Sequence, residues 1–235
     1  MKDTMKIVPS ILSDEVSVIE EQLAKLHSLS EDYQIDTVQM DIIDGEYADN
    51  ITISPLDLNQ FYFGDLQVDL HLMTIEPLDF VYEARELRDQ IQFGIVLGQI
   101  EKMSSQEDFV SEVKKHNWKP GLCIDAYTPI ESLSTAALEE TQVLQIMGIR
   151  AGFQGQAFIE QTYKTIIEAR ERIAQVNPDI ALYLDGGVKS EQLARLIELG
   201  VDAAVVGSVL WKATTVADGL DSLYEVIAEV ESDEY

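Results

Sequence analysis

The chain is short of several kinds of residue, and each shortage excludes a class of structure. Its 235 residues include one cysteine, Cys123, so no disulfide can form within the chain and a reducing compartment fits. No run approaches the roughly 18 apolar residues of a membrane-spanning helix, and no signal-type apolar region follows the first residues. We therefore expect a cytoplasmic protein that has no membrane partner.

Basic residues are also scarce. The chain has 16 Lys and Arg against 43 Asp and Glu, which gives a formal net charge of -27. Phosphate backbones and anionic membranes must be met by Lys and Arg, so this composition argues against nucleic acid as a partner. An acidic excess of this kind is typical of a solubilising surface or of adaptation to salt.

Short apolar runs alternate with helical patterns from one end of the chain to the other. The runs expected to be strands are about 6–12, 36–43, 66–73, 91–97, 120–125, 142–149, 180–185 and 202–207. Between them, segments such as 16–26 carry apolar residues at helical spacing. The alternation indicates eight strand-helix units.

This order of elements predicts the fold. Strands that alternate with helices pair in parallel through right-handed crossovers, and eight units of this total length close into a barrel. We predict the α/β class and a single (β/α)8 TIM barrel domain over residues 1–235. An open doubly wound sheet is the alternative, but no Gly-x-Gly-x-x-Gly motif follows an early strand.

Polar side chains stand near the ends of four expected strands, where barrel enzymes hold their active sites. Ser10, Asp41, His71 and Asp185 are these residues. The two-residue period of a strand also places Gln39 on the face of Asp41. Two carboxylates, an imidazole and an amide have the composition of a metal site with an acid/base pair.

Glycine-containing turns follow the last two expected strands, as Gly186-Gly187 and Gly207-Ser208. Backbone N–H groups exposed by such turns can cradle a phosphate without a Lys or Arg cluster. This pattern predicts a phosphorylated substrate. The segment with Gly152 after the expected strand at 142–149 is either an ordinary loop or one that closes over the substrate.

Stretches along nearly the whole chain match a known family in the expected order. They are 9–12, 40–45, 50–52, 69–73, 152–159, 185–187 and 207–208. Together they resemble the ribulose-phosphate 3-epimerase family, whose members act on pentulose phosphates and, in relatives, on hexulose phosphates. The resemblance implies a phosphorylated ketose as substrate and a homo-oligomer as one state of assembly.

The resemblance also implies roles for matching residues. Asp41 and Asp185 resemble the pair that moves the C3 proton from opposite faces of the substrate. These two residues with His71, and Gln39 as a fourth ligand, would hold a divalent ion such as Zn, Mn, Fe or Mg. The residues implied to bind substrate are Ser10, His71, Met73, Met147, Gly152, Gly155, Gly186, Gly187, Gly207 and Ser208.

The sequence departs from the family pattern around the metal and the sugar. The family's histidine two residues before the aspartate at position 41 is Gln39 here. An amide oxygen is a weaker and harder donor than imidazole, so zinc affinity should fall and Mn²⁺ or Mg²⁺ becomes comparatively favourable. Near the sugar, Glu46 replaces a histidine, Asp49 and Ala151 replace prolines, and Gln154 replaces a glycine.

We therefore predict an isomerase that performs metal-assisted 3-epimerisation of D-ribulose 5-phosphate and D-xylulose 5-phosphate, or of a related pentulose or hexulose phosphate. A sugar-phosphate-binding barrel that lost catalysis through Gln39 is the alternative, and the presence of both Asp41 and Asp185 argues against it. A lyase or decarboxylase is a third hypothesis, but no expected strand end carries the Asp-x-Lys-x-x-Asp pattern typical of such enzymes.

Overall fold

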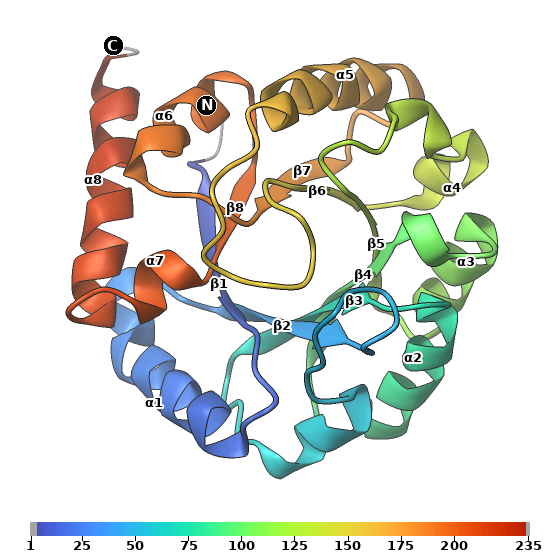
Figure 1. Ribbon diagram of the computed structural model, residues 1–235, viewed down its shortest axis with the longest axis horizontal. Helices are drawn as coiled ribbons and strands as arrows, with labels where there is room; N and C mark the ends of the chain where they lie inside the picture. The colour runs from blue at the N-terminus through green and yellow to red at the C-terminus, as the bar shows by residue number, and fades with distance from the viewer. Residues whose placement is uncertain (1–3, 234–235) are drawn as a thin grey trace.

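The computed structural model describes residues 4–233, in which eight parallel strands close into one barrel in sequence order (Figure 1). The strands are β1 Lys6–Ile11, β2 Thr37–Ile43, β3 Gln67–Met73, β4 Phe93–Gln99, β5 Lys119–Ile124, β6 Val143–Met147, β7 Ala181–Asp185 and β8 Ala203–Val206. Each lies within two residues of its expected range. The predicted (β/α)8 barrel is confirmed, and the open sheet was the wrong alternative.

The helices form an outer ring around the barrel (Figure 1). The α-helices are α1 Val16–Tyr33, α2 Pro77–Ala84, α3 Gln106–Lys115, α4 Thr135–Glu140, α5 Gln161–Val176, α6 Ser190–Glu198, α7 Ser208–Trp211 and α8 Val216–Asp233. Four short 3-10 helices join them: η1 Pro55–Gln60, η2 Arg85–Leu87, η3 Ile100–Lys102 and η4 Ile130–Ser132. Within residues 4–233, no helix has the length and apolarity needed to cross a bilayer.

Two apolar layers hold the barrel and its helices together. The helices bury one stripe each; in α1 the buried residues are Ile19, Leu23 and Leu26, at the spacing of one helix face. Alternate strand residues, such as Val38 and Met40 of β2, pack against that layer. The strand residues between them point into the barrel.

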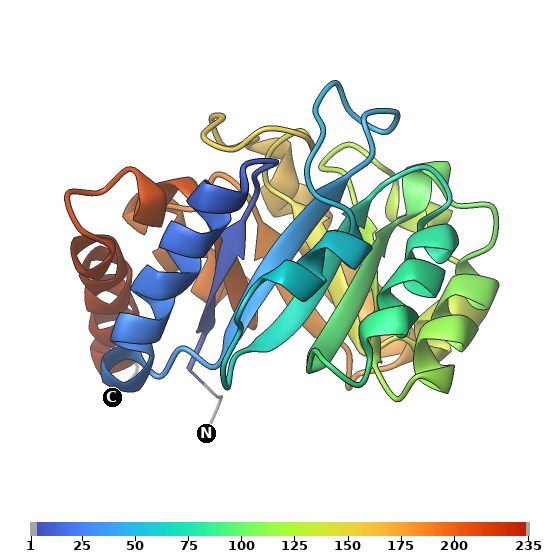
Figure 2. The same cartoon turned by 90° about the horizontal axis from the view of Figure 1, so that it is seen from below.

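The strand register brings the polar ends of neighbouring strands level. Asp41 of β2 is paired with His71 of β3, and Met147 of β6 is paired with Asp185 of β7. Because all eight strands are parallel, these residues meet at the carboxyl end of the barrel. The loops that follow β2 and β6 rise at this same end (Figure 2).

The loop after β6 crosses the mouth of the barrel (Figure 1). Its base is tied to β7 by a hydrogen bond from the Gly148 N–H to the Asp185 carbonyl, at 2.6 Å. Its tip is tied to the loop after β2, because the Asn50 side-chain nitrogen donates to the Gly152 carbonyl, also at 2.6 Å. The two loops together cover the carboxyl end.

Candidate active site

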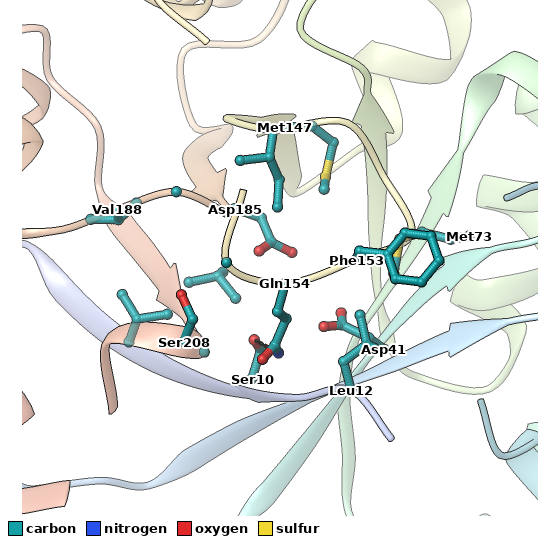
Figure 3. A pocket seen from close by; sticks show the side chains of 18 residues that line it. Ser10, Leu12, Asp41, Met73, Met147, Phe153, Gln154, Asp185, Val188 and Ser208 are labelled. Atoms are coloured by element: carbon teal, nitrogen blue, oxygen red, sulfur yellow. Dashed lines mark hydrogen bonds between the residues drawn. The ribbon is translucent and has the colours of Figure 1, made fainter. Parts of the chain in front are cut away.

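A narrow cavity lies at the carboxyl end of the barrel, beneath the loop after β6 (Figure 3). Its volume is about 30 Å³, which is room for about one or two water molecules. Most of the predicted site residues line it, namely Ser10, Asp41, Met73, Met147, Gly152, Gly155, Asp185, Gly186, Gly187, Gly207 and Ser208. The structure therefore brings residues from both halves of the chain to one place.

The two aspartates face each other across this cavity, and His71 lies within hydrogen-bonding distance of both. Nδ1 of His71 is 3.2 Å from Asp41 Oδ1 and 3.2 Å from Asp185 Oδ2. All three side chains are buried. Within residues 4–233, they form the one group of three or more His, Cys, Asp or Glu whose ligand atoms lie close enough to share an ion, within 4.8 Å of one another.

Gln39 lies between the same two carboxylates. Its amide nitrogen donates to Asp41 Oδ1 at 2.8 Å and to Asp185 Oδ2 at 2.7 Å. The side chain therefore presents N–H groups here, whereas a metal would need its amide oxygen. The role of Gln39 as a ligand stays a prediction that requires the amide to turn over.

Two further buried glutamines belong to this network, and the sequence analysis missed both. The side-chain amide nitrogen of Gln145 on β6 donates a hydrogen bond to Asp185 Oδ2 at 3.0 Å. The side-chain oxygen of Gln99 accepts from Nε2 of His71 at 3.2 Å. Each is a polar residue inside a buried strand, and Gln145 stands two residues before Met147 on the same face. This two-residue spacing in the sequence could have indicated that Gln145 faces the site.

Burial makes the charges of this cluster depend on one another. Burial, which has the largest effect, and the nearby charge of Asp185, which has the second largest, raise the pKa of Asp41 to about 6. Burial alone would lower the pKa of His71, but Cys123 and the two carboxylates outweigh it and raise that pKa above its ordinary value. The cluster can therefore hold and exchange a proton near neutral pH.

The glycine turns lie at one end of the cavity, and their role as a phosphate cradle stays a prediction. Gly186 and Gly187 have φ of +92° and +73°, a conformation that other residues adopt at a cost. Gly207 directly precedes Ser208, the first residue of the short helix α7. In barrels, loops after the seventh and eighth strands and a short extra helix commonly bind phosphate.

Two side chains lie against glycines of this region, and no sequence pattern indicated these approaches. A Cβ built on Gly207 would lie 2.4 Å from the amide nitrogen of Gln154, so that side chain fills the space beside the turn. The same nitrogen is 3.5 Å from Ser10 Oγ. A Cβ built on Gly155 would lie 2.4 Å from Nζ of Lys212, which places an ammonium group beside this glycine.

The sequence model of the ribulose-phosphate 3 epimerase family matches residues 6–211. The chain belongs to this family. The ribulose-phosphate 3-epimerase of Escherichia coli K12 is 30% identical over 228 residues, which cover 95% of this chain and 96% of that protein. The chloroplastic ribulose-5-phosphate-3-epimerase of Arabidopsis thaliana is 29% identical over 227 residues, covering 94% and 77%.

Solved structures show the same fold at lower identity. The 3-keto-L-gulonate-6-phosphate decarboxylase of Vibrio cholerae aligns with a TM-score of 0.68 and 12% identity, over 97% of this chain and 99% of that one. A 3-hexulose-6-phosphate synthase aligns with a TM-score of 0.64 and 14% identity, over 94% and 99%. These two likenesses establish the barrel and carry no information about the reaction.

The donor set fits the divalent ion implied by membership of the ribulose-phosphate 3 epimerase family. One imidazole nitrogen and two carboxylate oxygens are ligands that catalytic divalent ions accept while a position stays open for substrate. The separations of 3.2 Å from Nδ1 of His71 are close to the ligand spacing of about 3.4 Å around a four-coordinate ion. Gln99 holds Nε2 of His71, which leaves Nδ1 directed at Asp41 and Asp185.

Proposed function

We propose that this chain epimerises C3 of a ketose phosphate, with D-ribulose 5-phosphate and D-xylulose 5-phosphate or a related pentulose or hexulose phosphate as substrates. The observation that carries the proposal is the opposition of Asp41 and Asp185 across one cavity. One oxygen of each carboxylate is held by Gln39. The second oxygen of each carboxylate accepts no hydrogen bond from the part of the chain between residues 4 and 233. It is free to contact a substrate.

The proposed reaction needs two proton-transfer groups on opposite faces of C3. The hydrogen at C3 is weakly acidic because the neighbouring carbonyl accepts the electron pair that its removal leaves. One aspartate takes this proton, an enediolate forms, and the other aspartate supplies a proton from the opposite face. A pKa of about 6 for Asp41 lets that group occur in either form near neutral pH.

The walls of the cavity support an intermediate of this kind. The buried side chains of Met73 and Met147 line it and exclude water, which protects an enediolate from stray protonation. A divalent ion held by Asp41, His71 and Asp185 would polarise the carbonyl and stabilise the negative charge of the enediolate. We expect the ion to be one that accepts oxygen ligands, such as Mn²⁺ or Mg²⁺, because Gln39 stands where the family has histidine.

The phosphate is proposed to bind at the glycine turns. The backbone N–H groups of Gly187, Gly207 and Ser208 supply donors, and the ammonium of Lys212 adds positive charge at the edge. A cavity of about 30 Å³ is too small for a sugar phosphate. The loop that carries Gln154 must therefore move away when substrate enters.

The test is solvent deuterium exchange at C3, measured by NMR on a panel of ketose phosphates with metals added one at a time. We expect exchange and epimerisation of at least one pentulose or hexulose phosphate. Tight binding of a ketose phosphate without any exchange would replace the proposal with the sugar-phosphate-binding barrel. Release of carbon dioxide or of an aldehyde would indicate the lyase instead.

Two predictions about the protein's setting stand beside this function. The cytoplasmic location expected for a chain with a single cysteine stays a prediction. The homo-oligomer stays a prediction.

A further inference from the structure

The hydrogen bonds to the two aspartates differ in number. Asp41 Oδ1 is contacted by Gln39 and by Nδ1 of His71. Asp185 Oδ2 is contacted by the same two groups and, in addition, by the amide nitrogen of Gln145 at 3.0 Å. Gln145 is therefore the group that distinguishes one proton-transfer residue from the other.

Stability does not account for a glutamine at this position. The Gln145 side chain is fully buried, and its amide oxygen has no hydrogen-bond partner among residues 4–233. A buried polar atom without a partner destabilises a fold. The neighbouring inward residues of the same strand, Val143 and Met147, are apolar and fit the barrel without this cost.

The direction of the Gln145 side-chain amide explains why a glutamine is found at this position. Its nitrogen points to Asp185 Oδ2, on the side of the carboxylate already held by Gln39, so this oxygen has donors from two strands. A carboxylate fixed through one oxygen keeps its plane and leaves the other oxygen, Oδ1, in a constant position at the cavity. Rigid support of this kind is what a reacting group needs, because small misplacements slow a reaction strongly.

We propose that Gln145 is a positioning residue for Asp185, which holds this carboxylate in line with C3 of the substrate while Asp41 depends on other contacts. The inference rests on the proposed epimerisation. In the step concerned, the C3–H bond breaks, its electron pair stays on the sugar as the enediolate, and the proton goes to Asp185. The step run backwards returns a proton to C3.

The consequence is an asymmetry between two proton transfers. Without the amide of Gln145, the transfer by Asp185 should slow while the transfer by Asp41 changes little. The slower transfer then limits the rate more strongly. A primary isotope effect should therefore grow for the epimer whose C3 hydrogen is removed by Asp185, and shrink for the epimer whose C3 hydrogen is removed by Asp41.

The test compares Gln145→Met, which keeps the size of the side chain and removes the donor, with Gln99→Met as a matched control. Both glutamines are fully buried in the barrel interior beside His71, but Gln99 contacts neither Asp41 nor Asp185. For each protein, kcat, KM and the isotope effect on kcat/KM are measured with both C3-deuterated epimers, at saturating metal. For Gln145→Met we expect kcat to fall about 10- to 100-fold at an unchanged KM, with isotope effects that diverge between the epimers. For Gln99→Met we expect no divergence.

The outcomes separate the two proposals. Isotope effects that change in parallel for the two epimers, or do not change, would overturn the role of Gln145 and leave epimerisation intact. A wild-type protein that epimerises no ketose phosphate would overturn the function. In that case the crystal structure of Gln145→Met decides the inference, because an Asp185 carboxylate that keeps its wild-type position would refute it. If Gln145→Met does not fold, Gln145→Leu provides the same comparison.

Discussion

The side-chain amide nitrogen of Gln39 on β2 donates a hydrogen bond to Oδ2 of Asp185 on β7 at 2.7 Å. This bond spans the barrel and joins residues 146 positions apart in the sequence. The same nitrogen lies 2.8 Å from Asp41 Oδ1. One amide thus holds both carboxylates at the point where a fourth ligand of a shared ion would stand. An imidazole in this place would offer a lone pair instead of N–H donors, which predicts a change in metal binding.

Gln39→His should bind zinc more tightly than the wild-type protein, by about tenfold or more, because a neutral ring nitrogen suits Zn²⁺ better than an amide oxygen does. Titration calorimetry on metal-free protein measures the affinity directly. His71→Ala serves as a control that should weaken zinc binding in either background. Equal zinc affinity of the wild-type and Gln39→His proteins would contradict the ligand assignment.

Asp41→Asn and Asp185→Asn should each lower turnover by about 10²- to 10⁴-fold, because an amide cannot take up or release the C3 proton. Thermal denaturation of both variants distinguishes this effect from loss of the fold. Steady-state epimerisation with added metal measures the turnover. Near-normal rates in either variant would remove that aspartate from the mechanism.

Gly207→Val should raise KM for a phosphorylated ketose by about tenfold or more, because a side chain at this turn occupies the space where the phosphate is proposed to bind. A Cβ built at this position would lie 2.4 Å from the amide nitrogen of Gln154, so a valine side chain also crowds that glutamine. The measurement is KM for the phosphorylated ketose, and kcat should change less than KM. A KM equal to that of the wild type would place the phosphate elsewhere.

Gln154→Gly should have the opposite effect and lower KM for the phosphorylated ketose, because it removes the side chain that lies against Gly207. We expect a decrease of a few-fold, since the loop no longer has to withdraw a side chain before phosphate binds. Gln156→Gly is the matched control, because Gln156 lies in the same loop but donates to the carbonyls of Arg150 and Phe153. A decrease of equal size in both variants would show a general effect of loop flexibility.

Much of this architecture could be predicted because it depends on patterns local to the chain. The apolar run of β2 alternates, so Gln39 and Asp41 fall on one face whatever the rest of the fold does. Parallel strands then carry Asp41, His71 and Asp185 to one end of the barrel. These two rules are sufficient to bring these three residues together from sequence.

The remaining contacts depend on distances between strands and loops that no local pattern specifies. The approach of Gln145 to Asp185 requires the relative height of β6 and β7, which the pairing of Met147 with Asp185 establishes only in three dimensions. The approach of Gln154 to Gly207 depends on the course of a loop, as does the approach of Lys212 to Gly155. Such placements follow from the closed barrel as a whole.

Asp69 offers a test of stability apart from the site. It lies deeper in the barrel than His71, where it accepts hydrogen bonds from the Ile95 N–H at 2.7 Å and from the Gln67 amide at 3.2 Å. Burial raises the pKa of Asp69 to about 6, above its ordinary value of 3.8. A raised folded-state pKa means that folding favours the protonated carboxyl. The folded state therefore loses stability as the pH rises from about 4 through 6, and this loss levels off above about pH 7.

Asp69→Asn removes that ionisation and keeps an oxygen that can accept from Ile95. We expect the variant to be more stable than the wild-type protein at pH 7.5 by up to about 3 kcal/mol, which corresponds to a pKa difference of about two units. The advantage should shrink steadily toward pH 4, where the wild-type carboxyl is protonated in the folded protein and increasingly so in the unfolded chain. Urea denaturation at several pH values measures it as the difference in free energy of unfolding. A difference that stays constant across this range would mean that Asp69 is not the group whose titration destabilises the barrel.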